Sequence, residues 1–248
     1  SGNELREPHQ EGFDRDIEEQ LRWLKEHPES ISVSELGLVS LDQIGGISTA
    51  APTPGTGFEG ITQGGFIPGE PTCAGGPLNI FSAGNVSVTV TNKDGSNRVE
   101  TNGSTFFNAP VSEGGMSDAQ CYYDAVHGRF VALAFTQGTS PQHSNFYLNI
   151  SKTNDARGAW WNYKFDMTKD GNTSTSNWGD YESLGLSEDK LVMTSQQFTF
   201  STNSYRYQKV RVIDRAAVYS GGSASYVDFF NFSPPSGGDT NDNFVTKA

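Results

Sequence analysis

Cysteine, methionine and long apolar runs are scarce in this chain of 248 residues. It contains two cysteines, Cys73 and Cys121, and three methionines. Two cysteines cannot form the disulfide network that stabilises small secreted domains, although a single bridge between them stays open beside two reduced, buried thiols. No apolar run reaches the roughly 18 residues that a transmembrane helix needs, so membrane insertion is not expected.

Basic residues are also few, because 17 Lys and Arg stand against 29 Asp and Glu, a net charge of −12. Half of this charge falls within residues 1–36, which hold 10 acidic and four basic residues. Such a field repels nucleic-acid phosphates and anionic lipids, which argues against nucleic acid as a partner. A cationic partner or a neutral polymer such as a glycan stays open, beside the plainer interpretation that acidity keeps an exported protein soluble.

Glycine and aromatic residues are plentiful, with 28 Gly, 16 Phe and nine Tyr. This composition favours many short strands and tight turns, so the expected fold class is all-β. Residues 1–57 form a polar leader, in which apolar residues at helical spacing predict a short amphipathic helix over 13–27, followed by a linker of Gly, Pro, Ser and Thr. The folded domain is predicted to occupy residues 58–248.

Three strand units follow one another, headed by Glu70, Asp118 and Asp180. The second unit is the clearest, with strands predicted at 118–124, 129–135, 145–151 and 160–165. Four short strands joined by turns are typical of a propeller blade, and the unequal intervals between the units indicate loops of variable length. We therefore expect a β-propeller-like array of four-stranded antiparallel blades.

Three blades do not close a ring, since a propeller normally needs at least about four. The chain is therefore expected to belong to a larger ring or to dimerise, unless the repeat is in fact a sandwich. The third unit is the least regular, with strand segments predicted at 180–186, 191–194, 197–201, 207–213 and 226–232.

Three motifs succeed one another along the chain, at 118–124, 151–160 and 180–185. Their order resembles that of a group of exported bacterial β-propeller-like proteins without an assigned activity. The group tends to have proline where this chain has Ala119, Ala156 and Glu182. The resemblance implies an extracellular propeller, secreted or at the cell surface, and implies no reaction.

The segment 151–160 is also similar to a degenerate Asp-box of the sialidase type, with Asp155, Gly158 and Trp160 in the usual roles. The Asp side chain is expected to accept turn amides, the glycine to take a positive φ, and the Trp to pack between strands. An Asp-box is a folding device at the outer turn of a blade, so it implies a propeller rather than sialidase activity.

Acidic residues at the strand heads are the candidate site. Glu70, Asp118 and Asp180 begin the strands that would line a central channel, where they could converge with Asp124 and Glu182. Converging carboxylates can act as acid and base in glycoside hydrolysis, or can bind Ca²⁺, for which Asp118 and Asp180 are the candidate ligands. The alternative is that each carboxylate caps its own strand and binds local amides.

Exposed aromatic residues are the second group of ligand candidates. Trp178 and Tyr181 could stack on sugar rings, with Asp124 and Glu182 beside them as hydrogen-bonding groups. The aromatic stretch 160–165 alternates instead, and its apolar face is better suited to packing between blades.

The function expected from these patterns is an extracellular binding or scaffolding module with a glycan or protein partner at the cell surface. The alternative is a propeller glycoside hydrolase or lyase that acts on polysaccharide through channel carboxylates. A structural segment of a large adhesin-like chain is a third hypothesis. No His-Glu-x-x-His, Cys-x-x-Cys or phosphate-loop motif is present, and Ca²⁺ is the one cofactor that the acidic residues suggest.

Overall fold

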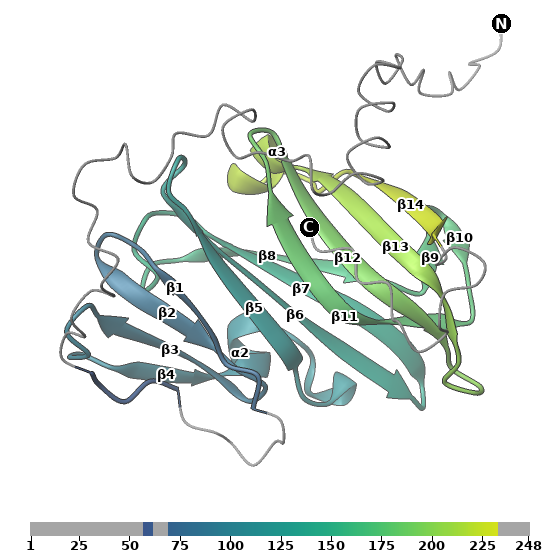
Figure 1. Ribbon diagram of the computed structural model, residues 1–248, viewed down its shortest axis with the longest axis horizontal. Coiled ribbons are helices and arrows are strands. Elements are labelled where there is room, and N and C mark those ends of the chain that lie inside the picture. Colours follow the sequence, from purple (N-terminus) through teal and green to yellow (C-terminus); the bar gives the residue numbers. More distant parts are fainter. Residues whose placement is uncertain (1–56, 62–68, 233–248) are drawn as a thin grey trace, which may run out of the picture. The chain divides into compact units, whose positions relative to one another are not determined.

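The computed structural model describes residues 57–61 and 69–232. The chain divides into two compact units, Ser1–Gly55 and Thr56–Ala248, and the fold is that of the second unit (Figure 1). The helix predicted at 13–27 and most of the linker lie outside the described residues. No helix within the described ranges is long and apolar enough to cross a membrane.

Three four-stranded antiparallel sheets dominate the described residues, which confirms the all-β, blade-like array (Figure 1). Consecutive strands pair in each sheet. The first blade contains β1 (Thr72–Gly75), β2 (Asn79–Ala83), β3 (Ser87–Asn92) and β4 (Val99–Asn102). The second contains β5 (Ser117–Asp124), β6 (Arg129–Thr139), β7 (Gln142–Ser151) and β8 (Trp160–Asp166). The third contains β11 (Asn177–Leu186), β12 (Lys190–Thr199), β13 (Tyr205–Asp214) and β14 (Tyr226–Phe232).

Short elements lie between the blades or, for α3, between β13 and β14 of the third blade, and the sequence did not predict them. They are the helices α2 (Gly103–Phe107) and α3 (Arg215–Tyr219), the 3-10 helix η3 (Val111–Glu113), and a two-stranded ribbon of β9 (Lys169–Asp170) and β10 (Thr173–Ser174). Each α-helix begins at a side-chain cap, because Asn102 accepts from the amide of Thr105 and Asp214 accepts from that of Ala217. The capping residues were the signal in the sequence for these two helices, since five residues are too few to show helical periodicity.

The third blade has one continuous strand where the sequence predicted two. The predicted segments 191–194 and 197–201 left Ser195 and Gln196 between them. In the structure both residues are buried and pair with β13, and the register shifts between Gln197 and Phe198 without ending the strand. Ladder hydrogen bonds on both sides satisfy the backbone of β12, so its polar centre still forms a strand.

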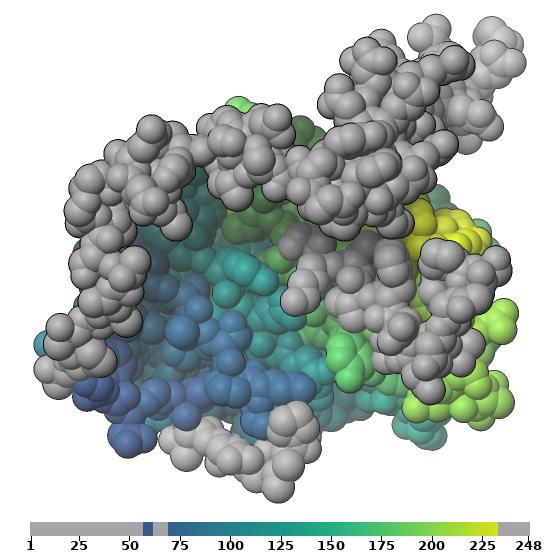
Figure 2. Space-filling view, in the orientation of Figure 1, coloured from purple at the N-terminus to yellow at the C-terminus, as the bar shows by residue number. Residues whose placement is uncertain are grey.

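The second blade is buried on both faces, because a hydrophobic core lies on each side of it. Alternate residues of β6 enter different cores: Phe130, Ala132 and Ala134 join the first blade, and Val131, Leu133 and Phe135 join the third. The alternation predicted for 160–165 is confirmed in the same way, since Trp160 packs on the first core while Trp161, Tyr163 and Phe165 pack on or within the second. Figure 2 shows the blue first blade packed directly against the teal second blade.

The corner between β7 and β8 joins the first two blades. Asp155 Oδ1 accepts a hydrogen bond from the backbone amide of Arg157 (2.9 Å) and another from Asn79 Nδ2 of β2 (2.5 Å). Asn79 Oδ1 in turn accepts from the amide of Ala156 (3.1 Å). The carboxylate therefore binds a neighbouring blade as well as its own turn.

Gly158 and Trp160 complete this corner. Gly158 does not have the positive φ that the Asp-box comparison led us to expect. A Cβ at this position would lie 3.2 Å from the carbonyl oxygen of Asp155, so close packing explains the glycine. The indole of Trp160 donates to the carbonyl of Ala156 (3.0 Å) and its ring packs on Phe81, with ring centroids 5.2 Å apart.

The two cysteines are free thiols. Cys73 is exposed, whereas Cys121 is buried, and burial raises the pKa of Cys121 to about 12. A thiol with so high a pKa is a poor nucleophile, so Cys121 acts as a small core residue.

Glu113 anchors η3 to the second blade. Its Oε2 accepts hydrogen bonds from Thr136 (2.8 Å), Asn145 (2.9 Å) and Tyr147 (2.6 Å), and its Oε1 accepts from Lys164 (2.5 Å). Burial opposes ionisation, but these four donors outweigh it and lower the pKa of Glu113 to about 2.

We expect Glu113→Gln to lower the free energy of unfolding by about 1–3 kcal/mol at neutral pH. Because the folded pKa lies below the ordinary value of 4.5, ionised Glu113 stabilises the fold above that pH and loses the effect as the pH falls toward 2. Urea denaturation at about pH 7 and about pH 3 measures this, since the variant should approach the wild type at the lower pH. Glu188→Gln, which changes an exposed residue, is the matched control. An equal deficit at both pH values would contradict the prediction.

Candidate ligand pocket

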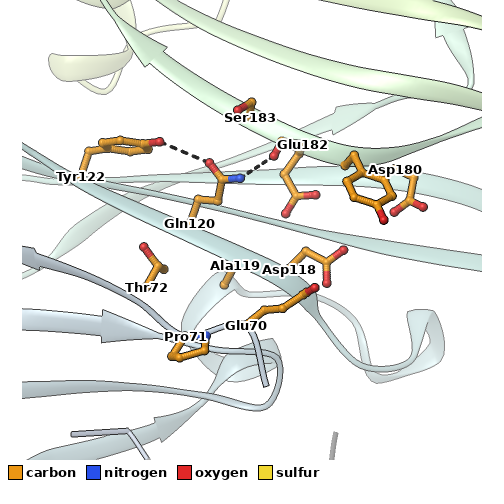
Figure 3. Close-up of a pocket in the computed structure, with 11 residues that line it drawn as sticks. Glu70, Pro71, Thr72, Asp118, Ala119, Gln120, Tyr122, Asp180, Glu182 and Ser183 are labelled. Carbon is orange, nitrogen blue, oxygen red and sulfur yellow. Dashed lines mark hydrogen bonds between the residues drawn. The ribbon is translucent and has the colours of Figure 1, made fainter. Parts of the chain in front are cut away.

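A pocket of about 600 Å³ lies between the first strands of the three blades, β1, β5 and β11 (Figure 3). Four carboxyl groups share it, those of Glu70, Asp118, Asp180 and Glu182. The remaining lining residues are polar, aromatic or small: Pro71, Thr72, Ala119, Gln120, Tyr122, Tyr181 and Ser183. The structure thus brings together four of the five acidic residues that the sequence singled out.

The backbone is bulged at this pocket. Asp118 and Ala119 together oppose a single residue of β6, and Tyr181 and Glu182 do the same between β11 and β12. Asp118 and Tyr181 have φ values of 52° and 48°, and Glu70, just before β1, has 43°. Side-chain-bearing residues rarely adopt positive φ, and such strain tends to accumulate at ligand sites.

The positions of the bulges show that the predicted alignment of the second and third strand units is off by one residue. Asp118 and Asp180 both lie in the first strand of their blade, as predicted, although β11 begins earlier, at Asn177. The equivalent of Asp118 is nevertheless Tyr181, and the equivalent of Ala119 is Glu182, because the unpaired positions are 118–119 in one strand and 181–182 in the other. Spacing in the sequence cannot reveal this offset, since a bulge adds a residue without changing the strand pattern.

Glu182 is the most unusual residue of the pocket. It is 3% exposed, and neither oxygen of its carboxyl has a hydrogen-bond partner among the described residues. Burial raises the pKa of Glu182 well above its ordinary value, and the nearby negative charge of Asp118 adds to this effect. Its carboxyl points toward Asp118 across the pocket (Figure 3). Such a group is expected to be uncharged, with its hydrogen-bonding capacity unused.

Burial and neighbouring negative charges also act on Asp118 and Asp180. Burial raises the pKa of Asp118 to about 7, with further contributions from a hydrogen bond with Glu70, the charge of Glu70 and the charge of Asp180. Burial also raises the pKa of Asp180, against the hydrogen bond from the amide of Tyr181 and together with the charge of Glu70. The proton of Asp118 is therefore held more tightly than that of an isolated aspartate.

The rim of the pocket links the second and third blades. Gln120 Nε2 donates to the backbone oxygen of Glu182 (2.5 Å), and the hydroxyl of Tyr122 donates to Gln120 Oε1 (3.4 Å) (Figure 3). Tyr122 and Tyr181 are 39% and 58% exposed. Sequence reasoning missed Gln120 and Tyr122, although the period of two along β5 places both on one face.

Two predicted ligand residues do not line this pocket. Asp124 lies at the opposite end of β5, where the hydroxyl of Tyr219 (2.9 Å) and Nδ1 of His127 (2.8 Å) contact its Oδ2. Burial opposes ionisation of Asp124, but hydrogen bonds from His127 and Tyr219 lower its pKa. Trp178 packs on Phe198, with ring centroids 5.3 Å apart. Asp124 and Trp178 therefore make tertiary or local contacts away from the pocket.

Within residues 57–61 and 69–232, no group of three or more His, Cys, Asp or Glu side chains is arranged to hold a metal ion. Asp118 and Asp180, the candidate Ca²⁺ ligands, therefore share a pocket without forming a coordination sphere with a third such residue. No family model, curated protein or solved structure matches the chain.

Proposed function

We propose that this chain is an extracellular binding module whose acidic pocket holds a glycan. The observation that carries the proposal is the buried carboxyl of Glu182, which lies at a β-bulge, has no partner among the described residues and shares the pocket with three further carboxyl groups. Carboxyl oxygens can accept hydrogen bonds from sugar hydroxyls. The exposed rings of Tyr122 and Tyr181 are suited to stacking on a sugar.

Glycoside hydrolysis is the second candidate, and Asp118 is the residue that favours it. A carboxyl with a pKa of about 7 keeps its proton near neutral pH, where it can protonate a glycosidic oxygen. An ionised carboxyl on the opposite side of the bond would then serve as base or nucleophile. Binding and hydrolysis would use the same pocket.

A larger ring would explain the outer face of the third blade. Val227 pairs with Val212 and Phe229 pairs with Val210, so these four side chains share one face of the sheet. Val227 and Phe229 are 59% and 47% exposed. An apolar face of this kind is suited to a further blade of the same plan, which supports the proposal that the array is incomplete.

Binding to soluble polysaccharides, measured by isothermal titration calorimetry with the full chain, tests the glycan proposal. We expect at least one polysaccharide to bind, and Tyr181→Asn to weaken that binding about tenfold through loss of the ring. Asparagine is chosen because it tolerates the positive φ at this position.

The control for this experiment is Glu188→Gln, an exposed position in the same blade, which should bind as the wild type does. Equal weakening in the control, or no binding across the panel, would contradict the proposal. A reducing-end assay on the same polysaccharides separates the two candidates, since hydrolysis that Asp118→Asn abolishes would indicate an enzyme.

A further inference from the structure

The charge of the pocket restricts what it can bind. Among the described residues, those that line it include four carboxyl groups and no Lys, Arg or His. Three of these carboxyls, those of Asp118, Asp180 and Glu182, are held in surroundings that disfavour the ionised form. A negatively charged ligand would add to this repulsion, so phosphates, sulfates and uronic acids are poor candidates.

A divalent metal is also a poor match for this arrangement. Ca²⁺ needs six to eight oxygens at about 2.3–2.6 Å from one point. Among the described residues, the acidic side chains do not form such a group. An ammonium makes at most three hydrogen bonds, so it needs fewer oxygens around one point than Ca²⁺ does.

An ammonium group satisfies both the charge and the donor requirements. It carries three N–H donors and no acceptor, so several carboxyl oxygens can bind it at once through charge-assisted hydrogen bonds. The tyrosine rings at the rim, Tyr122 and Tyr181, add faces that attract a cation. A neutral sugar would use the hydrogen bonds and leave the negative charge of the pocket without a counter-charge.

We infer that the ligand of this pocket carries a primary ammonium group, as in a glycan built from unacetylated amino sugars. The inference rests on the proposed glycan-binding function and specifies its ligand class. The ammonium would lie among the carboxyls of Glu70, Asp118, Asp180 and Glu182, which approach the pocket from the segment before β1, from β5 and from β11.

Proton release distinguishes this mode of binding from simple docking. Within the part of the chain that the structure describes, the titratable groups that line the pocket are the four carboxyls and the two tyrosine hydroxyls. An ammonium favours the ionised form of every carboxyl near it, so binding should drive a proton from Asp118 or Glu182 into the buffer. A neutral oligosaccharide of the same length should release none.

The experiment compares three β-1,4-linked tetramers that differ only at carbon 2 of each sugar: those of glucosamine, N-acetylglucosamine and glucose. Calorimetry with the full chain is done at low ionic strength and about pH 6, where the amino groups are charged and Asp118 mostly keeps its proton. Repeating each titration in two buffers of different ionisation enthalpy counts the protons released. Calcium chloride and sodium chloride of equal ionic strength serve as competitors.

We expect the glucosamine tetramer to bind at least about tenfold more tightly than the other two, with net proton release. Asp118→Asn should abolish the preference and Glu188→Gln should retain it. Equal binding of all three tetramers would overturn the ammonium inference and leave glycan binding intact. Binding by none would overturn the inference, and the polysaccharide panel would still decide the glycan proposal.

Two further results would overturn the ammonium inference. Loss of the preference in Glu188→Gln would mean that the overall negative charge, rather than the pocket, attracts the tetramer. Competition by calcium beyond that by sodium at equal ionic strength would assign the pocket to a divalent metal.

Discussion

At about pH 8 the Glu182→Gln variant is expected to melt about 4 °C above the wild-type protein, a gain of about 1–2 kcal/mol. The pKa of Glu182 is higher in the fold than in the unfolded chain, whose ordinary value is 4.5. Its contribution to stability is therefore fully present below that value and is lost as the pH rises toward the folded pKa. Glutamine stays neutral throughout, so the variant avoids this loss.

Thermal melts at about pH 5 and about pH 8 measure the effect, because the advantage of the variant should nearly vanish at the lower pH. Glu188→Gln, an exposed glutamate of the same blade, should melt as the wild type does at both pH values. A variant that is equally destabilised at both would show that the Glu182 carboxyl makes a favourable contact that the fold depends on. If Glu182→Gln stabilises the fold and also abolishes ligand binding, Glu182 behaves as a residue that serves the site at the expense of stability.

Removal of Asp228 is expected to cost about 3–5 kcal/mol, because it leaves the charge of Arg211 buried without its partner. Asp228 binds the guanidinium through two hydrogen bonds, from Nε (2.6 Å) and Nη2 (2.7 Å), and both side chains are fully buried. Asp228 also accepts from the amide of Gly171 (2.8 Å). The guanidinium lies 3.9 Å from the ring centre of Tyr226.

Urea denaturation of Asp228→Ala measures this cost, and the double variant Arg211→Met with Asp228→Leu tests its cause. The double variant removes both charges and should recover much of the loss, since the penalty comes from one unpaired buried ion. Asp189→Asn, at an exposed ion pair with Lys190, should leave the denaturation midpoint unchanged. A loss below about 1 kcal/mol in Asp228→Ala would mean that Arg211 finds water or another partner.

The blades were predictable wherever side-chain alternation and turn chemistry agreed. The second blade follows both patterns, and its four strands lie close to the predicted bounds. Prediction failed where tertiary contacts replaced local signals. β12 is polar at Ser195 and Gln196 and is held by pairing on both sides, and the two short helices depend on single capping residues.

The site was predictable to the extent that strand order determines it. Glu70, Asp118 and Asp180 share a pocket because the first strands of neighbouring blades lie beside one another. Asp124 was grouped with them wrongly, since it occupies the other end of β5. The burial of Glu182 depends on a bulge, and no pattern in the sequence distinguishes a bulge from ordinary variation in loop length.

The side-chain links between neighbouring blades determine how this domain should unfold. Asn79 and Asp155 connect the first blade to the second, and Asp124 and Tyr219 connect the second to the third. Each blade therefore draws part of its stability from its neighbours, as in repeat proteins whose units are coupled only to the next unit. The central blade has two such interfaces and each outer blade has one among the described residues. Opening should begin at the ends of the array, and the second blade should be the most persistent cooperative unit of the chain.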